Sequence, residues 1–233
     1  SKLNNELGKT NDKIKELNLG VIASISGRFY SMDRDKKWDR TIKAYNTIVT
    51  GKAPVNNNIY DVIEKSYKDG KLDEFIEPTI INKDGLITSD DGILFANFRT
   101  DRATQILAPI TNPYFKEFDN EKIENIKLTS LMPCSNQVIG EYAFQLEELK
   151  NTLGVYLSAL NFNQLRIAET EKYAHVTYFF DGGKDVLLEG CDRALIPSPK
   201  VETYDLKPEM SANEVTKDLI KAIDSGRYDF ILI

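Results

Sequence analysis

The sequence predicts an α/β protein with two domains, and three observations lead to this expectation. Segments with apolar residues at helical spacing alternate along the chain with short apolar, β-branched segments. The 233 residues are 41% hydrophobic and 28% charged, which is typical of a globular chain that forms one large or two small domains. An irregular stretch at residues 133–140 precedes a new helical pattern, and this change predicts domains at residues 1–146 and 147–233.

The first of these domains is expected to contain helices and strands in alternation. Helical spacing ends before a glycine in three places, which is how many helices terminate. These patterns predict helices over residues 2–17, 38–49 and 59–67, and a fourth helix that begins within residues 101–107. Apolar, β-branched runs predict strands over residues 21–25, 77–82, 93–98 and 126–131.

The second domain is expected to begin with a long helix. Residues 147–170 have a helical pattern, and residues 175–180 form an apolar run that ends at Gly182 and predicts a strand. Ser211 and Glu214 have the spacing of a capping box, so a helix is predicted over residues 211–223. The apolar residues 228–233 predict a last strand.

Composition and charge exclude several classes of function. The net charge of −6, from 30 basic and 36 acidic residues, is unlike that of a nucleic-acid-binding domain. No run approaches the roughly 20 apolar residues that span a membrane. A single histidine, His175, cannot supply a histidine-rich metal site. Cys134 and Cys191 lie far apart and predict free thiols, which indicates a cytoplasmic protein.

Arginines are concentrated in two short runs, residues 27–40 and 98–102. These runs hold five of the eight arginines in an acidic chain, and both follow a predicted strand. Ligands of open α/β sheets bind beyond the carboxyl ends of the strands. Arginine binds phosphate and carboxylate groups through two parallel hydrogen bonds and stays charged at all ordinary pH values. The pattern therefore predicts a site for a small polyanionic metabolite.

A structural interpretation of the same residues stays open at this stage. Asp33, Asp35 and Asp39 could neutralise Arg28 and Arg34 and form a self-paired surface loop. The spacing of Arg99 and Arg102 predicts that both lie on one face at a helix start, where backbone N–H groups also favour anions. Lys172 either contacts a phosphate, donates a proton, or belongs to an ordinary charged helix end. Trp38 is expected to anchor its loop in the core.

Four motifs carry a resemblance to a known family. In order and spacing, the chain resembles the cofactor-independent phosphoglycerate mutases over essentially its whole length, through GRFYSMDRDKKWDR, FRTDRATQ, AETEKYAHVTYFFDGG and PSPKVETYDLKPEMSA. The resemblance implies a central fragment of an enzyme about twice as long. Residues 1–146 would be an N-terminally truncated phosphotransferase domain. Residues 147–233 would be the start of an alkaline-phosphatase-like domain.

The resemblance also implies an activity and a set of site residues. The family interconverts 3-phosphoglycerate and 2-phosphoglycerate through a phosphoserine intermediate, using two divalent metals, usually manganese. Its nucleophilic serine and its metal ligands match no residue of this chain, so the isolated chain is expected to be inactive and to hold no metal. Arg28, Arg34, Arg99 and Arg102 match substrate-binding arginines. Lys172 matches a lysine that binds substrate and takes part in catalysis.

Other implied properties complete this interpretation. The partner is a small phosphoglycerate, not a nucleic acid or a membrane, and the protein is expected to be monomeric. Glu171 matches a position near the metals, and Asp181 is acidic where the family leads us to expect a neutral residue. A non-catalytic module that binds phosphometabolites is the alternative function.

Overall fold

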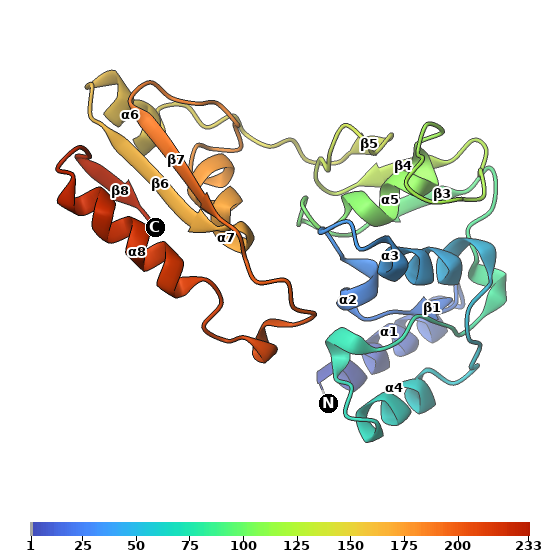
Figure 1. The fold of residues 1–233 in the computed structure, drawn as a ribbon. Coiled ribbons are helices and arrows are strands. Elements are labelled where there is room, and N and C mark those ends of the chain that lie inside the picture. Colours follow the sequence, from blue (N-terminus) through green and yellow to red (C-terminus); the bar gives the residue numbers. More distant parts are fainter. Residues whose placement is uncertain (1) are drawn as a thin grey trace. The chain divides into compact units, whose positions relative to one another are not determined.

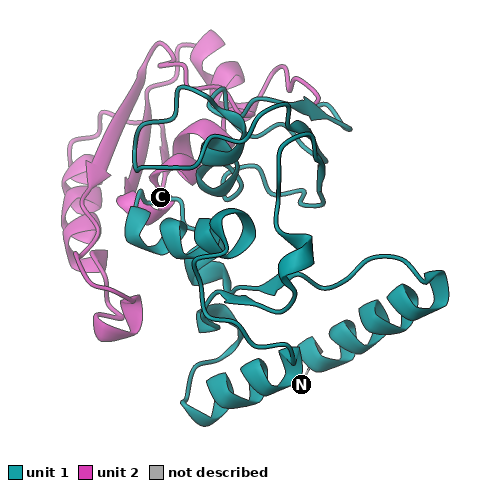
Figure 2. Cartoon of the chain, turned by 90° about the vertical axis from the view of Figure 1, so that its right-hand side faces the viewer, with its two compact units in different colours: residues 1–146 teal, residues 147–233 magenta. Residues whose placement is uncertain are grey.

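The computed structural model describes residues 2–233, which separate into two compact units (Figure 2). Unit 1 comprises residues 1–146 and unit 2 comprises residues 147–233. Each unit has buried hydrophobic residues of its own, so each is described separately.

One end of unit 1 is built from two helices and a small antiparallel sheet (Figure 1). The helices are α1 (Lys2–Leu17) and α4 (Ile59–Lys68), and the sheet pairs β1 (Ser24–Ile25) with β2 (Thr79–Ile80). Ile59, Ile63 and Ile76 form the core here, and Leu3 and Leu7 of α1 pack against it. The helical spacing of the apolar residues in α1 therefore corresponds to a half-buried face, which ends before the exposed Leu17.

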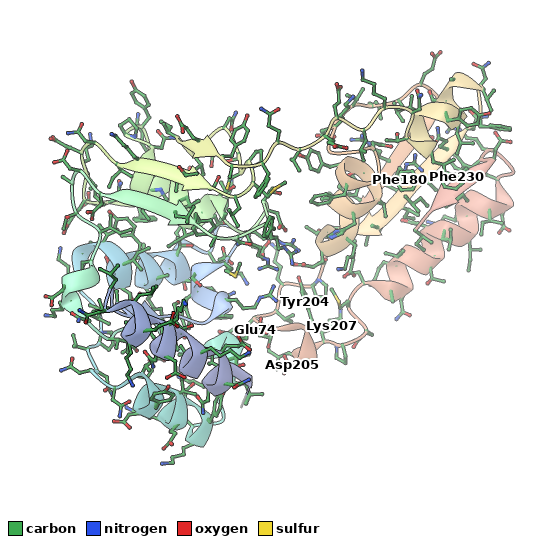
Figure 3. The ribbon with its side chains drawn as sticks, turned by 180° about the vertical axis from the view of Figure 1, so that it is seen from behind. Glu74, Phe180, Tyr204, Asp205, Lys207 and Phe230 are labelled. Atoms are coloured by element: carbon green, nitrogen blue, oxygen red, sulfur yellow. The ribbon has the colours of Figure 1, made fainter. Side chains whose placement is uncertain are left out.

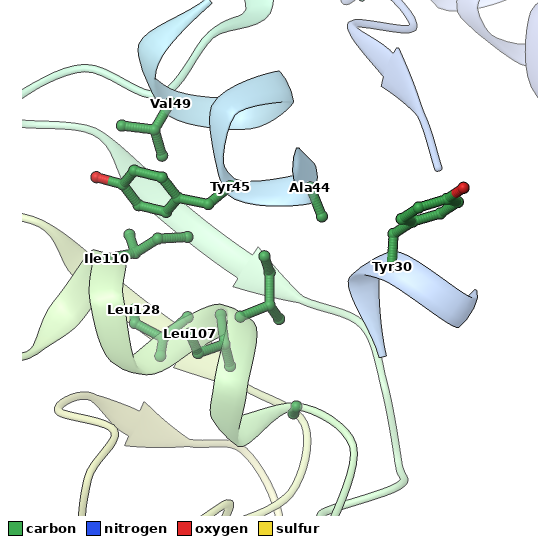
Figure 4. Packing of buried hydrophobic residues seen from close by; sticks show 9 residues of the cluster. Tyr30, Ala44, Tyr45, Val49, Leu107, Ile110 and Leu128 are labelled. Carbon is green, nitrogen blue, oxygen red and sulfur yellow. The ribbon is translucent and has the colours of Figure 1, made fainter. Parts of the chain in front are cut away.

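The rest of unit 1 is a parallel sheet with helices packed against it (Figure 4). Its strands are β3 (Gly92–Phe95), β4 (Lys127–Ser130) and β5 (Glu141–Tyr142), in the order β3-β4-β5. The helices are α2 (Arg28–Ser31), α3 (Trp38–Tyr45), a π-helical turn (Asn46–Thr50) that continues α3, and α5 (Thr104–Thr111). Tyr45, Leu107 and Leu128 lie in the core between these layers. Two 3₁₀ turns, Asp73–Phe75 and Lys83–Gly85, complete the unit.

Unit 2 is built on a second parallel sheet, in the order β7-β6-β8. Its strands are β6 (Gln164–Glu169), β7 (Cys191–Ile196) and β8 (Phe230–Leu232). The helical segments are α6 (Leu153–Ala159), α7 (Thr170–Ala174) with a π-helical turn (His175–Phe179), a 3₁₀ turn (Tyr204–Leu206), and α8 (Ala212–Asp224). Leu165 and Ile167 of the central strand pack with Val215 of α8.

The structure confirms a mixed α/β protein with parallel sheets, but it corrects two of the predicted elements. The predicted helix over residues 147–170 is wrong, because α6 is short and β6 follows it. The predicted strand over residues 175–180 is also wrong, because this apolar run is helical. Strand β7 was not predicted, and α5 begins at Thr104, after both arginines of its turn. Short apolar runs do not distinguish buried strands from buried helices, which explains the first two errors.

The remaining helices begin and end close to the predicted residues. Gly51 and Gly70 both adopt positive φ angles where the preceding helices end, as expected for glycines that terminate helices. Over residues 2–233, none of the helices combines the length and the apolar character needed to cross a bilayer.

Candidate functional site

Two arginines of unit 1, one from each arginine run, bind the same carboxylate. Asp101 Oδ2 accepts a hydrogen bond from Arg34 Nη1 at 2.6 Å, and Asp101 Oδ1 accepts one from Arg99 Nε at 2.7 Å. Arg99 Nη2 adds a third bond to Oδ2 at 3.2 Å. Burial alone would raise the pKa of Asp101, but the hydrogen bonds from Arg99 and Arg34 outweigh it and lower that pKa to about 2. Asp101 is therefore ionised at neutral pH.

Arg102 lies near the other three arginines. Its Nη1 donates a hydrogen bond to the backbone oxygen of Met32 at 2.9 Å, and its buried Nε has no partner in the described chain. Burial lowers the pKa of Arg102, and the positive charges of Arg34, Arg28 and Arg99 lower it further. The guanidinium group of Arg102 therefore lies within electrostatic range of three other arginines, although the four belong to two runs far apart in the sequence.

Arg28 stands at the beginning of α2 with its side chain exposed. It forms no hydrogen bond or ion pair with the described residues of unit 1. The backbone places it firmly, because Gly27 N–H donates to the backbone oxygen of Ile76 at 2.8 Å. A Cβ at Gly27 would overlap the backbone oxygen of Glu74, so only glycine fits this close approach of two chain segments.

A buried carboxylate holds the loop that carries Arg34. Asp33 Oδ2 accepts hydrogen bonds from the backbone N–H groups of Asp35 (3.1 Å) and Lys37 (3.0 Å), and from Gln105 Nε2 (2.8 Å). The other end of the Gln105 amide accepts from Lys36 N–H at 2.8 Å. The side chains of Asp33 and Gln105 therefore tie the loop to helix α5. Arg34 belongs to this loop, so these bonds hold its backbone in place.

The described contacts of the first arginine run lie partly within the run and partly outside it. Asp33 accepts hydrogen bonds from backbone donors of its own loop and forms an ion pair with Arg40, whose Nη1 lies 4.0 Å from Asp33 Oδ1. Arg34 donates a hydrogen bond to Asp101, 67 residues further along. Trp38 is half-buried, and its ring packs edge-on against Phe115 with centroids 5.7 Å apart; it is not one of the buried core residues that the prediction expected.

Arg99 and Arg102 are close together, but not on a helix face. The helix α5 begins at Thr104, so both arginines belong to the turn that connects β3 to α5. Arg99 N–H donates to Asn97 Oδ1 at 2.9 Å, which tightens this turn. The turn itself, and not a helix N-terminus, therefore presents the two guanidinium groups.

In unit 2, Lys172 lies in the short helix α7, directly after the central strand β6. Its side chain is exposed and forms no hydrogen bond or ion pair with the described residues of its own unit. Lys172 thus lies just beyond the carboxyl end of a parallel strand, which is where ligands of open α/β sheets bind.

A loop fastens the region around Lys172. Tyr204 OH donates to Glu171 Oε1 at 2.9 Å, and Ser211 N–H donates to Glu169 Oε2 at 2.8 Å. Ser198 N–H donates to Thr170 Oγ1 at 3.1 Å. Tyr204 and its neighbours Asp205 and Lys207 belong to this loop between β7 and α8 (Figure 3). The predicted Ser211–Glu214 capping box is not formed, because the Ser211 hydroxyl donates to the backbone oxygen of Pro197 instead.

Replacing Tyr204 by phenylalanine is expected to loosen α7. The change keeps the ring but removes the donor to Glu171, at a cost of about 1 kcal/mol. Hydrogen exchange of the amides at residues 170–174 should become faster. Tyr156→Phe on α6 is the control, because the structure records no hydrogen bond for that exposed hydroxyl. Equal protection of α7 in both variants would show that the Tyr204–Glu171 contact does not hold the helix.

Opposite Leu165 and Ile167, the other face of strand β6 carries polar side chains that are also buried. Arg166 is fully buried, and its Nη2 donates to Gln164 Oε1 at 2.8 Å and lies 3.7 Å from Asp181 Oδ1. Its guanidinium also lies over the rings of Phe180 and Phe230, which are side by side (Figure 3). Neither carboxylate oxygen of Asp181 accepts a hydrogen bond from a described residue. Burial raises the pKa of Asp181, and the charges of Arg166 and Arg193 only partly oppose this.

The described residues do not form a metal centre. No three side chains from His, Cys, Asp or Glu come together as candidate ligands within residues 2–233. Metal sites of either the zinc or the magnesium type need such a set. The residues of this chain therefore do not fit the divalent metals that the family resemblance implies.

The sequence patterns did not reveal several residues that build this site. Asp33 carries a local signal, since an aspartate that accepts N–H groups two and four residues later forms a recurrent turn. Gln105 and Tyr204 carry none, because their partners lie 72 and 33 residues away. The central place of Asp101 between two arginines likewise depends on tertiary structure.

Comparisons with known proteins place the chain among enzymes of one kind. A family model described as "BPG-independent PGAM N-terminus (iPGM_N)" matches residues 1–136. The chain is 50% identical over 226 residues to the 2,3-bisphosphoglycerate-independent phosphoglycerate mutase of Clostridium tetani, and 50% identical over 228 residues to that of Francisella philomiragia. These matches cover 94% and 96% of this chain, which spans 44% of the length of each relative.

A solved structure agrees with the sequence comparisons. The crystal structure of Leishmania mexicana phosphoglycerate mutase at low cobalt concentration matches with a TM-score of 0.81 and 25% sequence identity. The match covers 97% of this chain and 44% of the other. Because the family model covers residues 1–136 of 233, the chain belongs to the family of 2,3-bisphosphoglycerate-independent phosphoglycerate mutases.

Proposed function

We propose that this chain supplies the phosphoglycerate-binding arginines of a glycolytic phosphoglycerate mutase. The whole enzyme would interconvert 3-phosphoglycerate and 2-phosphoglycerate. One observation carries the proposal: Arg34 and Arg99, from two distant runs, bind the same carboxylate in unit 1, within the residues that the family model matches. The identity of about 50% to curated mutases supports the same activity.

The substrate has the charges that such a cluster recognises. A phosphoglycerate carries a phosphate and a carboxylate, and guanidinium groups bind both through paired, charge-assisted hydrogen bonds. Arg28, Arg34, Arg99 and Arg102 would hold these groups in place. Phosphoryl transfer depends mainly on positioning and on electrostatic stabilisation of the transferred group. Fixed arginines therefore supply chemistry that the reaction needs.

Lys172 would contribute a further positive charge from unit 2. As an exposed lysine without an acidic partner in its unit, it can contact a phosphate oxygen or donate a proton to a leaving oxygen. We propose that the loop residue Tyr204 holds the start of α7, and with it Lys172, through Glu171.

The remaining parts of the mechanism would come from outside these 233 residues. A phosphoserine intermediate needs a nucleophilic serine, and the family resemblance assigns that serine and two divalent metals to other segments. Residues 2–233 offer no ligand set of their own for these metals. The isolated chain is therefore expected to bind substrate without turning it over.

Arg28→Ala provides the most direct test. Because Arg28 is exposed and unpaired in unit 1, its loss should leave the free energy of unfolding within about 0.5 kcal/mol of the original value. Calorimetric titration with 3-phosphoglycerate should show affinity that is roughly 10- to 100-fold weaker, as expected when a charge-assisted contact is lost.

Arg227→Ala is the matched control for the loss of one positive charge. Arg227 is an exposed arginine of unit 2 that pairs with Asp192. If both variants bind 3-phosphoglycerate like the original chain, the arginine cluster is not the binding site. Turnover by the isolated chain would instead contradict the expected inactivity, and binding without turnover in an intact enzyme would favour a non-catalytic binding module.

A further inference from the structure

The buried ion pair of unit 2 is longer than a hydrogen bond. Arg166 Nη2 lies 3.7 Å from Asp181 Oδ1, whereas an N–H···O hydrogen bond spans about 2.7–3.2 Å. The two side chains are 0% and 4% exposed, so bulk solvent reaches neither of them. Buried charged groups in folded proteins almost always have hydrogen-bond partners. This pair therefore needs further partners inside unit 2.

Several unpaired polar atoms lie in the same part of unit 2. Both carboxylate oxygens of Asp181 accept no hydrogen bond from the described residues, and Arg166 Nε and Nη1 find no oxygen acceptor among them. Thr152, directly before α6, has a buried hydroxyl that also has no partner there. A buried donor or acceptor without a partner is destabilising. Because these atoms are fully buried, a partner has to lie next to them inside the protein.

Two glycines shape the surroundings of this ion pair. A Cβ at Gly154 would lie 2.4 Å from Asp181 Oδ1 and 2.6 Å from Arg166 Nη2, so any side chain there would enter the space beside both charged groups. A Cβ at Gly182 would lie 3.2 Å from Thr152 Cγ2, which places Thr152 next to the turn that follows Asp181. Gly154 therefore keeps side-chain atoms out of the space beside the two charged groups.

The charges and the hydrogen-bonding groups indicate which molecule suits this space. A guanidinium and a carboxylate have opposite charges, so the pair needs no counter-ion and favours a neutral molecule. That molecule has to donate to a carboxylate oxygen and accept from a guanidinium N–H group. Water does both, and a buried water typically makes about three hydrogen bonds to otherwise unpaired polar groups. A polar contact longer than about 3.5 Å is also where a bridging water is expected.

We propose that unit 2 contains an internal water site, in which one enclosed water donates to the Asp181 carboxylate, accepts from the Arg166 guanidinium and bonds the Thr152 hydroxyl. The site would join three segments: the start of α6, the central strand β6 and the turn after residues 175–179. It is independent of the proposed function, because it lies within unit 2 and contacts no group of the substrate.

A crystal structure of the chain is the direct test. We expect density for one water within about 2.6–3.2 Å of both the Asp181 carboxylate and the Arg166 guanidinium. A direct hydrogen bond between Arg166 and Asp181, with no molecule between them, would overturn the proposal. A halide ion at this place, recognised by its anomalous scattering, would overturn it as well.

NMR tests the same site in solution. An enclosed water exchanges much more slowly than surface water, so cross-relaxation between water and the backbone protons of Gly154 should have the sign of a long-lived complex. Gly154→Ala should remove this signal, because its Cβ would enter the space beside the ion pair. Gly8→Ala is the control, since no atom lies within 4 Å of its added Cβ. A signal that is absent from the original chain, or unchanged in Gly154→Ala, would refute the site.

Thr152→Val tests the third partner, because the two interpretations predict opposite signs. If the hydroxyl has no partner, valine removes an unpaired buried group, and the urea midpoint for exchange of the β6 amides should rise or stay the same. If the hydroxyl binds the enclosed water, the midpoint should fall by about 0.5 M. Thr216→Val makes the same replacement at an exposed position of α8 and should leave the midpoint unchanged. A midpoint of Thr152→Val at or above that of this control would contradict the proposal.

Discussion

Replacing Arg166 by methionine is expected to lower the free energy of unfolding of unit 2 by about 3–5 kcal/mol, the usual cost of leaving a buried charge without its partner. Methionine fills a similar space beside Phe180 and Phe230, so the packing loss is small. The main cost comes from Asp181, which loses its charged partner. Its carboxylate is buried and accepts no hydrogen bond from a described residue. Hydrogen exchange of the β6 amides under increasing urea measures the change.

A double-mutant cycle with Asp181→Asn identifies the cause of this loss. The Asp181→Asn change would leave Arg166 with its bond to Gln164 and with both aromatic rings, so the single variant should be neutral or more stable. Combining both substitutions should recover a large part of the loss caused by Arg166→Met. If the double variant is no more stable than Arg166→Met alone, the destabilisation comes from packing and not from the unpaired carboxylate.

The same pair predicts how the stability of unit 2 depends on pH. Burial raises the pKa of Asp181 above 3.8, so the folded state takes up a proton more readily than the unfolded state. The contribution of Asp181 to the free energy of unfolding is therefore most favourable at low pH. It becomes less favourable as pH rises through the interval between 3.8 and the raised pKa. The stability gain of Asp181→Asn over the original chain should grow through this interval and then stay constant.

In unit 1, Asp33→Ala is expected to cost about 2–4 kcal/mol and to weaken 3-phosphoglycerate binding at the same time. The change leaves three donors without their acceptor, and a buried unsatisfied donor costs about 1–3 kcal/mol. The loop of Arg34 would then lose one of its two ties to Gln105 and keep only the bond from Lys36 N–H. Trp38, the single tryptophan of the chain, follows the unfolding of unit 1 by fluorescence in urea.

Asp39→Ala is the matched control for this substitution. It removes an exposed carboxylate from the first turn of α3, a few residues from Asp33, without touching the loop. We expect a change of less than about 1 kcal/mol and unchanged binding. Comparable losses in both variants would mean that charge, not the bonds of Asp33 to the loop, stabilises this region.

The sequence predicts most of unit 1 because its signals are local. Helix α1 shows a clear spacing of apolar residues, and Gly51 and Gly70 mark helix ends through their positive φ angles. Strands β1 and β2 are shorter than the apolar runs that predicted them, since pairing extends over only two residues of each. The ends of such strands depend on the strand with which they pair. The sequence of one strand alone does not specify that pairing.

The errors in unit 2 have a common physical cause. Strand β6 carries Gln164 and Arg166 on one buried face, so its pattern of apolar and polar residues differs from that of an ordinary buried strand. Residues 175–179 are apolar and partly β-branched, yet they continue α7 as a π-helical turn. In both places the tertiary environment decides between strand and helix.

For the candidate site, the arginine runs in the sequence predicted which arginines lie in one region. The sequence did not predict that Arg34 binds a carboxylate of the other run. Clustering of Arg28, Arg34, Arg99 and Arg102 predicted residues that prove to interact in unit 1. Their acidic neighbours suggested pairing within each run, which occurs between Arg99 and Asp101, whereas Arg34 binds Asp101 of the other run. Their role as substrate ligands, and that of Lys172, stays a prediction until a titration tests it.

Each unit is formed by one continuous stretch of residues, and this has a consequence for biosynthesis. All residues of unit 1 are translated before the 87 residues of unit 2 (233 minus 146), whose synthesis takes roughly 4 to 17 s at 5–20 residues per second. Unit 1 therefore has time to fold while translation continues. Unit 2 cannot complete its sheet so early, because its central strand pairs with residues 230–232, among the last of these residues to be translated.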